Sequence, residues 1–166
     1  MIIRLAVFVS LAVLVTTGAL AADDCAQVRA ATLAGVSRPY AASIKVDSGN
    51  DLPLTSHVVM TGDKMYVEMR RVWNSTPMTT KELIDKVNKT TLKDQLVCQR
   101  GGEERLDGVS TTLFIVDDQT PAHASHSRIW IAANGLPLKT EVHLRGVGVV
   151  TSLFDYEHVQ PPGGAH

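Results

Sequence analysis

The chain has 166 residues, of which 45% are hydrophobic and 20% are charged. Its 16 lysines and arginines and 17 acidic residues give a formal net charge of −1. A balance this close to neutral provides no overall attraction to nucleic acid or to an anionic membrane surface, so neither class of partner is expected.

Residues 1–21 have the pattern of a signal peptide. Arg4 supplies the positive charge, Leu5–Val15 is an apolar run, and Ala19–Ala21 places small residues at a cleavage site. The apolar run is shorter than the roughly 20 residues that cross a bilayer, although a retained N-terminal anchor is the alternative. Aspartates directly before Cys25 do not fit a lipid-modified N-terminus. We therefore predict an exported, periplasmic protein that is cleaved near Ala21.

A helix and three strands are predicted next. The predicted elements are a helix over Asp23–Ser37 and strands over Tyr40–Asp47, Leu54–Met60 and Lys64–Trp73. In the third strand, Met65, Val67 and Met69 alternate with polar residues, so they are expected to share one face of the sheet.

A second helix is predicted over Thr79–Lys89. Thr79 and Glu82 have the spacing of a capping box, and Leu83 belongs to the apolar stripe of this helix. Pro77, just before it, ends the preceding strand.

The remainder of the chain is predicted to be β-structure. Strands are expected over Gln95–Arg100, Val109–Val116, the two arms of Ser127–Arg145, and Val149–Val159. A polar hinge is expected at Gly101-Gly102, and Asn134-Gly135 predicts a type I′ hairpin turn. After that turn, apolar residues including Val142 and Leu144 alternate with charged ones, which predicts one covered and one solvated face. Residues 161–166 are expected to be disordered.

The order of these elements defines an α+β fold. Strands and helices do not alternate as β-α-β units, so a parallel sheet is not expected. We predict a curved antiparallel β-sheet, a half-open barrel, with an N-terminal and a mid-chain helix packed on its concave face.

Cys25 and Cys98 are the only cysteines. An even count in an exported protein favours a disulfide. The alternatives are two buried thiols, or a pair that lies too far apart to form a bond.

Three segments resemble the LolA/LolB-like superfamily of exported proteins. They are Gly62–Met78 (GDKMYVEMRRVWNSTPM), Trp130–Lys139 (WIAANGLPLK) and Leu153–Val159 (LFDYEHV). The resemblance implies a relative of the lipoprotein carriers rather than the carrier itself. It also implies that residues 22–160 form a single half-barrel domain whose hollow accepts acyl chains or other apolar ligands.

The apolar residues that we expect in such a hollow come from both halves of the chain. They are Met65, Val67, Met69, Trp73, Met78, Leu83, Ile129, Ile131, Val142 and Leu144. The methionines suit an adaptable apolar surface, although filling gaps in a core is the alternative for each of them. No cofactor is expected.

Enzymatic motifs are sparse. His123 and His126 lie near Asp117 and Asp118, which is the best local cluster for a metal ion or a catalytic site. The chain has neither a metalloprotease H-E-x-x-H motif nor a G-x-S-x-G nucleophile elbow. We therefore predict no catalytic residue and no metal site.

The leading hypothesis is a monomeric, non-enzymatic periplasmic carrier that holds an acyl chain, a lipoprotein or another apolar ligand. Such a carrier can also have a partner protein in the cell envelope. The alternative is a structural or sensor module of the cell envelope that has a filled core and binds another protein. A third hypothesis is an enzyme that uses the His123–His126 loop.

Overall fold

The computed structural model describes residues 17–49, 52–91, 96–120 and 124–163. These residues form two helices and nine strands. The elements are α1 (Thr17–Val36), β1 (Tyr40–Asp47), β2 (Leu54–Met60), β3 (Lys64–Met69), β4 (Val72–Pro77), α2 (Thr80–Thr91), β5 (Leu96–Leu106), β6 (Val109–Asp118), β7 (Ser125–Ala132), β8 (Pro137–Leu144) and β9 (Gly148–Asp155).

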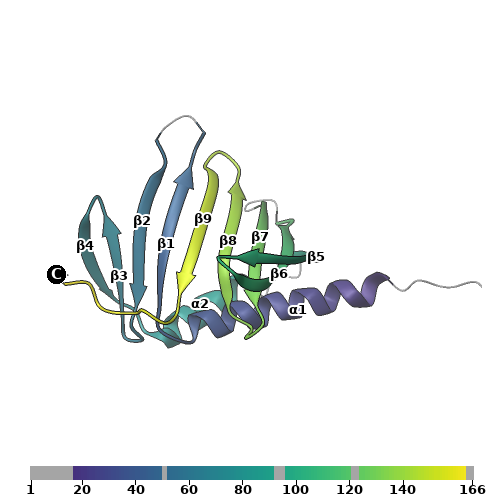
Figure 1. Ribbon diagram of the computed structural model, residues 1–166, viewed down its shortest axis with the longest axis horizontal. Helices are drawn as coiled ribbons and strands as arrows, with labels where there is room; N and C mark the ends of the chain where they lie inside the picture. The colour runs from purple at the N-terminus through teal and green to yellow at the C-terminus, as the bar shows by residue number, and fades with distance from the viewer. Residues whose placement is uncertain (1–16, 50–51, 92–95, 121–123, 164–166) are drawn as a thin grey trace, which may run out of the picture.

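All nine strands belong to one antiparallel sheet with the order β4-β3-β2-β1-β9-β8-β7-β6-β5. The sheet is open, because β4 and β5 lie at its two edges and do not pair with each other. Figure 1 shows the strands side by side, with α1 and α2 near one end of them. The predicted α+β class, with an open antiparallel sheet and two helices, is confirmed.

The strand register assigns every side chain to one of two faces, because directly paired residues point to the same side. Cys98 is bonded to α1, so its face is the one that α1 covers, and we call it the inner face. Passing from partner to partner across the sheet, this face contains Val116, Ile129, Val142, Val150, Ile44, Val58 and Val67. The opposite side is the outer face.

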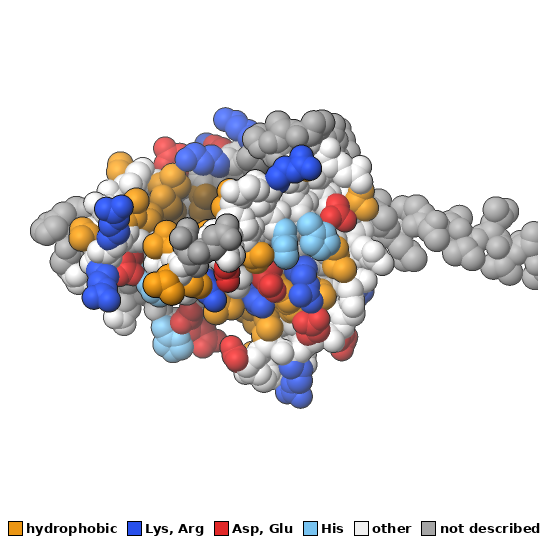
Figure 2. All heavy atoms as spheres, turned by 90° about the horizontal axis from the view of Figure 1, so that it is seen from above, with side chains coloured by type: hydrophobic (Ala, Val, Ile, Leu, Met, Phe, Trp, Pro, Cys, Tyr) orange, Lys and Arg blue, Asp and Glu red, His pale blue; other side chains and the backbone are white. Residues whose placement is uncertain are grey.

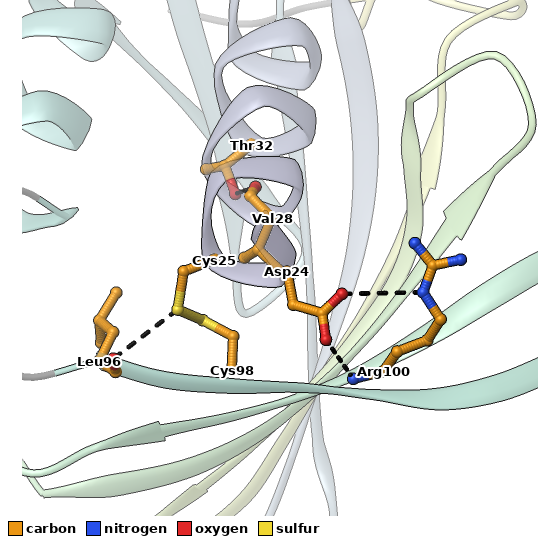
Figure 3. The surroundings of a disulfide bond; sticks show 7 residues. All are labelled: Asp24, Cys25, Val28, Thr32, Leu96, Cys98 and Arg100. Carbon is orange, nitrogen blue, oxygen red and sulfur yellow. Dashed lines mark hydrogen bonds and ion pairs between the residues drawn. A yellow bond between two sulfur atoms is a disulfide. The ribbon is translucent and has the colours of Figure 1, made fainter. Parts of the chain in front are cut away.

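Helix α1 is fixed to the sheet by the disulfide between Cys25 and Cys98, whose Cα atoms are 5.1 Å apart. The predicted disulfide is therefore confirmed. Beside it, the Asp24 carboxylate accepts the backbone N–H of Arg100 at 3.0 Å and lies 3.7 Å from the Arg100 Nε atom (Figure 3). The core under the helix consists of Val28, Ala31, Cys98, Phe114, Val116 and Ile131.

Helix α1 begins at Thr17, six residues before the predicted start. The extra segment, TGALAA, contains three alanines and a leucine, which are strong helix formers. The predicted cleavage site near Ala21 thus lies within α1, and cleavage itself stays a prediction. The rest of the predicted signal peptide lies outside the described residues. Within the described ranges, no helix combines the length and the apolar character needed to cross a membrane.

The predicted single strand over Lys64–Trp73 is wrong, because it is a hairpin of β3 and β4. The chain turns at Arg70 and Arg71, which both have positive φ angles, 53° and 67°. Such angles are characteristic of a type I′ turn, which usually contains asparagine or glycine. Two arginines gave no turn signal in the sequence.

Two further strand boundaries differ from prediction. The expected hinge at Gly101-Gly102 is an irregularity inside β5, which continues to Leu106. A side chain at Gly101 would lie within 3.0 Å of Leu113, so the absence of one lets the two strands approach. Strand β9 ends at Asp155, earlier than expected, because the Asp155 carboxylate accepts the backbone N–H groups of Glu157 and His158 and turns the chain.

The expected type I′ turn at Asn134-Gly135 is also wrong. Only Gly135 has a positive φ angle, 81°. The Gly135 N–H donates to the Ala132 carbonyl, and the Ala132 N–H donates to the Leu136 carbonyl. This is a type I turn followed by a left-handed glycine, and the pairing of β7 with β8 shifts beside it.

The capping box of α2 is confirmed. The Thr79 hydroxyl accepts the Glu82 N–H at 3.2 Å, and the Glu82 carboxylate accepts the Thr79 N–H at 2.7 Å. This backbone hydrogen bond lowers the pKa of Glu82, because it stabilises the charged carboxylate.

Candidate functional site: the open part of the inner face

Helix α1 covers only part of the inner face. It packs mainly on β5 and also contacts β6, β8 and α2. Under it, Phe114, Val116 and Ile131 are buried. The part of the inner face beneath α1 is therefore an ordinary hydrophobic core.

The inner face of β1–β4, β8 and β9 is open by comparison, apart from the buried Ala42 and Met60. Met69 and Leu54 are 64% and 63% exposed, and Val72 is 58% exposed. Around them lie apolar residues that are only partly buried, namely Ile44, Val46, Val58, Met65, Val67, Val142 and Val150. We call this surface, together with Leu144, the inner hollow. Viewed along the strands in Figure 2, hydrophobic side chains gather in a hollow of the surface.

No charged side chain lies on the inner face of β1–β4, β8 or β9, strands that the structure describes completely. The polar members of this face are neutral and are Ser56, Asn74, Thr76, Thr140 and Ser152. All charged side chains of these strands, such as Lys45, Glu68 and Glu141, point to the outer face. The site can therefore bury an apolar molecule without desolvating a charge.

The aromatic residues Tyr40, Phe154 and Tyr156 gather near the end of the sheet where α1 joins β1. The Tyr40 and Phe154 rings are 6.0 Å apart, and the Tyr156 hydroxyl donates to the Pro137 carbonyl at 2.9 Å. Burial raises the pKa of Tyr40 and of Tyr156 above the usual 10, and phenols are neutral at physiological pH in any case. This cluster adds no charge to the site.

A separate cleft of about 410 Å³ lies between α1 and strands β6 and β7. Its helix side consists of Gln27 and three alanines, Ala30, Ala31 and Ala34, and its sheet side includes Phe114. Because alanine side chains are short, α1 cannot fill the space above the sheet here.

The predicted site residues do not all lie together. Met65, Val67, Met69, Val142 and Leu144 are in the inner hollow, as the register shows. Ile129 and Ile131 share the inner face but belong to the core beneath α1. Leu83 is half-buried on α2, and Met78 lies in a groove beside α2 with Pro77, Glu82, Asp85, Lys86 and Lys89.

Trp73 is on the outer face and does not contribute to the inner hollow. It lines a pocket of about 370 Å³ together with Ala41, Ala42, Ser43, His57, Val58, Val59, Leu153, Phe154 and Asp155. The difference follows from the missed turn. In one continuous strand Trp73 would share a face with Met69, whereas the two-residue turn pairs Met69 with Val72 and reverses the alternation.

Five further residues of the inner hollow were not predicted from the sequence, namely Ile44, Val46, Leu54, Val58 and Val72. The signal for β1 was present, because Ile44 and Val46 alternate with Ser43 and Lys45. The position of Val72 could not be inferred without the turn at Arg70.

The histidine cluster lies on the outer face. The His126 Nδ1 atom is 2.7 Å from the Asp117 Oδ1 atom, and the His126 and His143 rings are 5.9 Å apart. In the described part of the chain, no three His, Cys, Asp or Glu side chains are placed to hold a metal ion. His123 lies outside the described residues.

No protein-family model matches the sequence, and no curated protein is similar to it. Among solved structures, the chain is similar to the lipoprotein LppX of Mycobacterium tuberculosis, with 19% identity, a TM-score of 0.50, and coverage of 84% of this chain and 98% of that one. LprF of Mycobacterium bovis matches with 12% identity, a TM-score of 0.49, and coverage of 87% and 98%.

A LolA superfamily protein of Nitrosomonas europaea also matches, with 9% identity, a TM-score of 0.35, and coverage of 82% of this chain and 92% of that one. At these identities the comparison concerns the fold alone. The chain has the open half-barrel fold of LppX, and the predicted LolA-like resemblance is confirmed at this level.

Proposed function

We propose that the protein is a non-enzymatic binding or carrier protein that holds an acyl chain or another apolar ligand in the inner hollow. It acts as a monomer in the periplasm after removal of residues 1–21. The likeness to the lipoprotein LppX supports an envelope location. A lipoprotein acyl chain is one ligand of this kind.

The observation that carries the proposal is the combination of exposure and neutrality in the inner hollow. Large apolar residues such as Met69 and Leu54 stay exposed on the inner face without a charged neighbour on that face. An exposed apolar patch on a folded protein usually marks a binding site. Ten buried methylenes would contribute about 8 kcal/mol before the costs of association.

A titration with a fluorescent acyl-chain probe tests this proposal. Met69→Asp places a charge in the inner hollow, so we expect the affinity for the probe to fall about tenfold or more. Leu153→Asp is the matched control, because Leu153 is 49% exposed but lies on the outer face. Equal affinities of the two variants, or no probe binding by the wild type, would contradict the proposal.

The second candidate is a structural or sensor module of the cell envelope that binds another protein. The pocket around Trp73 favours it, because Leu153, which lines this pocket, is half-exposed. This candidate predicts that a partner remains bound after delipidation and that Leu153→Asp releases it. Binding of the acyl probe with Met69-dependent affinity separates the two candidates.

A further inference from the structure

The large hydrophobic side chains that are exposed to solvent are concentrated at one end of the sheet. Of the nine such side chains in the described ranges, six lie in or beside the β1–β2, β3–β4 and β8–β9 turns, namely Leu52, Leu54, Met69, Val72, Leu144 and Val147. Figure 1 shows these three turns at the end of the strands opposite α1 and α2. We call these residues the apolar rim. Leu52 is 94% exposed and is the most exposed of them.

Three arginines occupy the same turns. Arg70 and Arg71 form the β3–β4 turn, and Arg145 follows β8. Within the ranges that the structure describes, none of the three takes part in an ion pair. The rim therefore combines apolar tips with cations that are available to an external partner.

Three of the acidic side chains that the structure describes at this end have hydrogen-bonding partners. The Asp47 carboxylate accepts the Gly49 N–H at 3.0 Å, and Asp117 lies 2.7 Å from the His126 Nδ1 atom. The Asp118 carboxylate accepts the Thr120 N–H at 2.8 Å. The net charge of −1 gives the whole molecule no attraction to anions, but the arginines give the rim a local one.

We propose that this rim docks on a bilayer surface that contains anionic phospholipid. The apolar tips enter the interface, and the arginines bind lipid phosphates. Apolar insertion and basic charge add to each other in binding an anionic membrane surface. The purpose of the contact rests on the proposed function, because an acyl chain could then move between the bilayer and the inner hollow without crossing water.

The shape of the rim favours a bilayer over a protein partner. Its outermost residues, Leu52 and Val147, lie in separate turns and outside the inner hollow. A fluid interface accommodates separate tips, whereas a protein interface needs a contiguous complementary surface.

Vesicle flotation of the purified protein tests the apolar part of the proposal. We expect flotation with vesicles of phosphatidylcholine and phosphatidylglycerol, weaker flotation with phosphatidylcholine alone, and loss at high salt. Leu52→Asp with Val147→Asp should lower the partition coefficient about tenfold or more. The control pair is Leu153→Asp with Val109→Asp, since Val109 and Val147 are both 46% exposed and Val109 lies outside the rim.

A second pair of variants tests the charges. Arg70→Gln with Arg71→Gln should reduce flotation on anionic vesicles about tenfold and leave flotation on neutral vesicles unchanged. The control is Arg38→Gln with Lys64→Gln, which removes two exposed cations from the other end of the strands. Acyl-probe binding is measured on every variant. It should be unchanged by Leu52→Asp with Val147→Asp, because neither residue is part of the inner hollow.

The outcomes distinguish this inference from the proposed function. A wild type that binds the acyl probe but does not float overturns the membrane contact and leaves the carrier proposal intact. Equal losses in rim and control variants also overturn it, because they would show non-specific adhesion. Flotation that depends on the rim supports the contact even if the acyl probe does not bind.

Discussion

The two halves of the sheet have the same alternation of apolar and polar residues, but the inner-face residues are buried in one half and exposed in the other. On β5–β7, inner-face residues such as Phe114 and Val116 are buried beneath α1. On β3 and β4, inner-face residues such as Met69 and Val72 are exposed. Coverage by a helix, rather than the strand sequence, therefore distinguishes the core from the candidate binding surface.

This comparison also shows how α1 is held in place. The helix is attached to β5 by the Cys25–Cys98 bond and by the contacts between Asp24 and Arg100. Its alanines leave space over β6 and β7. Helix α1 is thus attached at the β5 edge of the sheet, and the inner face at the opposite edge stays uncovered.

The largest expected difference between the two halves of the sheet is in how much a truncation lowers the free energy of unfolding. Phe114→Ala should lower the free energy of unfolding by about 4 kcal/mol, because it leaves a cavity in the core. Met69→Ala should change it by less than about 1 kcal/mol, because Met69 is already largely exposed. Urea denaturation of both variants measures this difference. Similar losses would show that the inner hollow is part of the core.

Removal of the disulfide should lower the stability of the half of the sheet that α1 covers. The bond joins residues 73 positions apart, so Cys25→Ser with Cys98→Ser should cost about 4 kcal/mol in the chain-entropy model. A reductant should destabilise the wild type by a similar amount and leave the double variant unaffected. A double variant as stable as the oxidised wild type would contradict this role.

A substitution in the β3–β4 turn should increase the stability of the protein. Arg71 has a φ angle of 67°, and a left-handed conformation costs a residue with a side chain about 1–2 kcal/mol. Arg71→Gly should therefore raise the free energy of unfolding by about 1 kcal/mol. Thermal denaturation provides the measurement, and Lys64→Gly in the extended part of β3 should be destabilising by comparison. A loss of stability with Arg71→Gly would contradict the turn geometry.

The smallest effect concerns the α2 cap and its dependence on pH. Since its folded-state pKa lies below the usual 4.5, the Glu82 carboxylate stabilises the fold above that value and loses this effect as the pH falls through its folded pKa. Glu82→Gln should thus be less stable than the wild type at pH 7, and the gap should narrow at acidic pH. Urea denaturation across this range tests it, and a constant gap would count against the cap.

Much of the fold could be predicted from local chemistry. Strand alternation indicated which residues of β3 and β8 share the inner face, and the Thr79–Glu82 spacing predicted the start of α2. The export pattern and the even cysteine count favoured the Cys25–Cys98 bond.

One error comes from backbone geometry without its usual sequence signal. Arg70 and Arg71 adopt left-handed angles that favour glycine or asparagine, so the turn between β3 and β4 was missed and Trp73 was assigned to the wrong face. The extent of helix coverage depends on tertiary packing, so the sequence could not separate buried Ile131 from exposed Met69.

Native mass spectrometry of the protein purified from cells without added lipid tests the central claim most directly. We predict an additional mass that extracts into organic solvent as a lipid or another apolar molecule, and that Met69→Asp reduces its occupancy. An unliganded mass for the wild type, together with no binding of the acyl-chain probe, would contradict the claim that the inner hollow is a binding site.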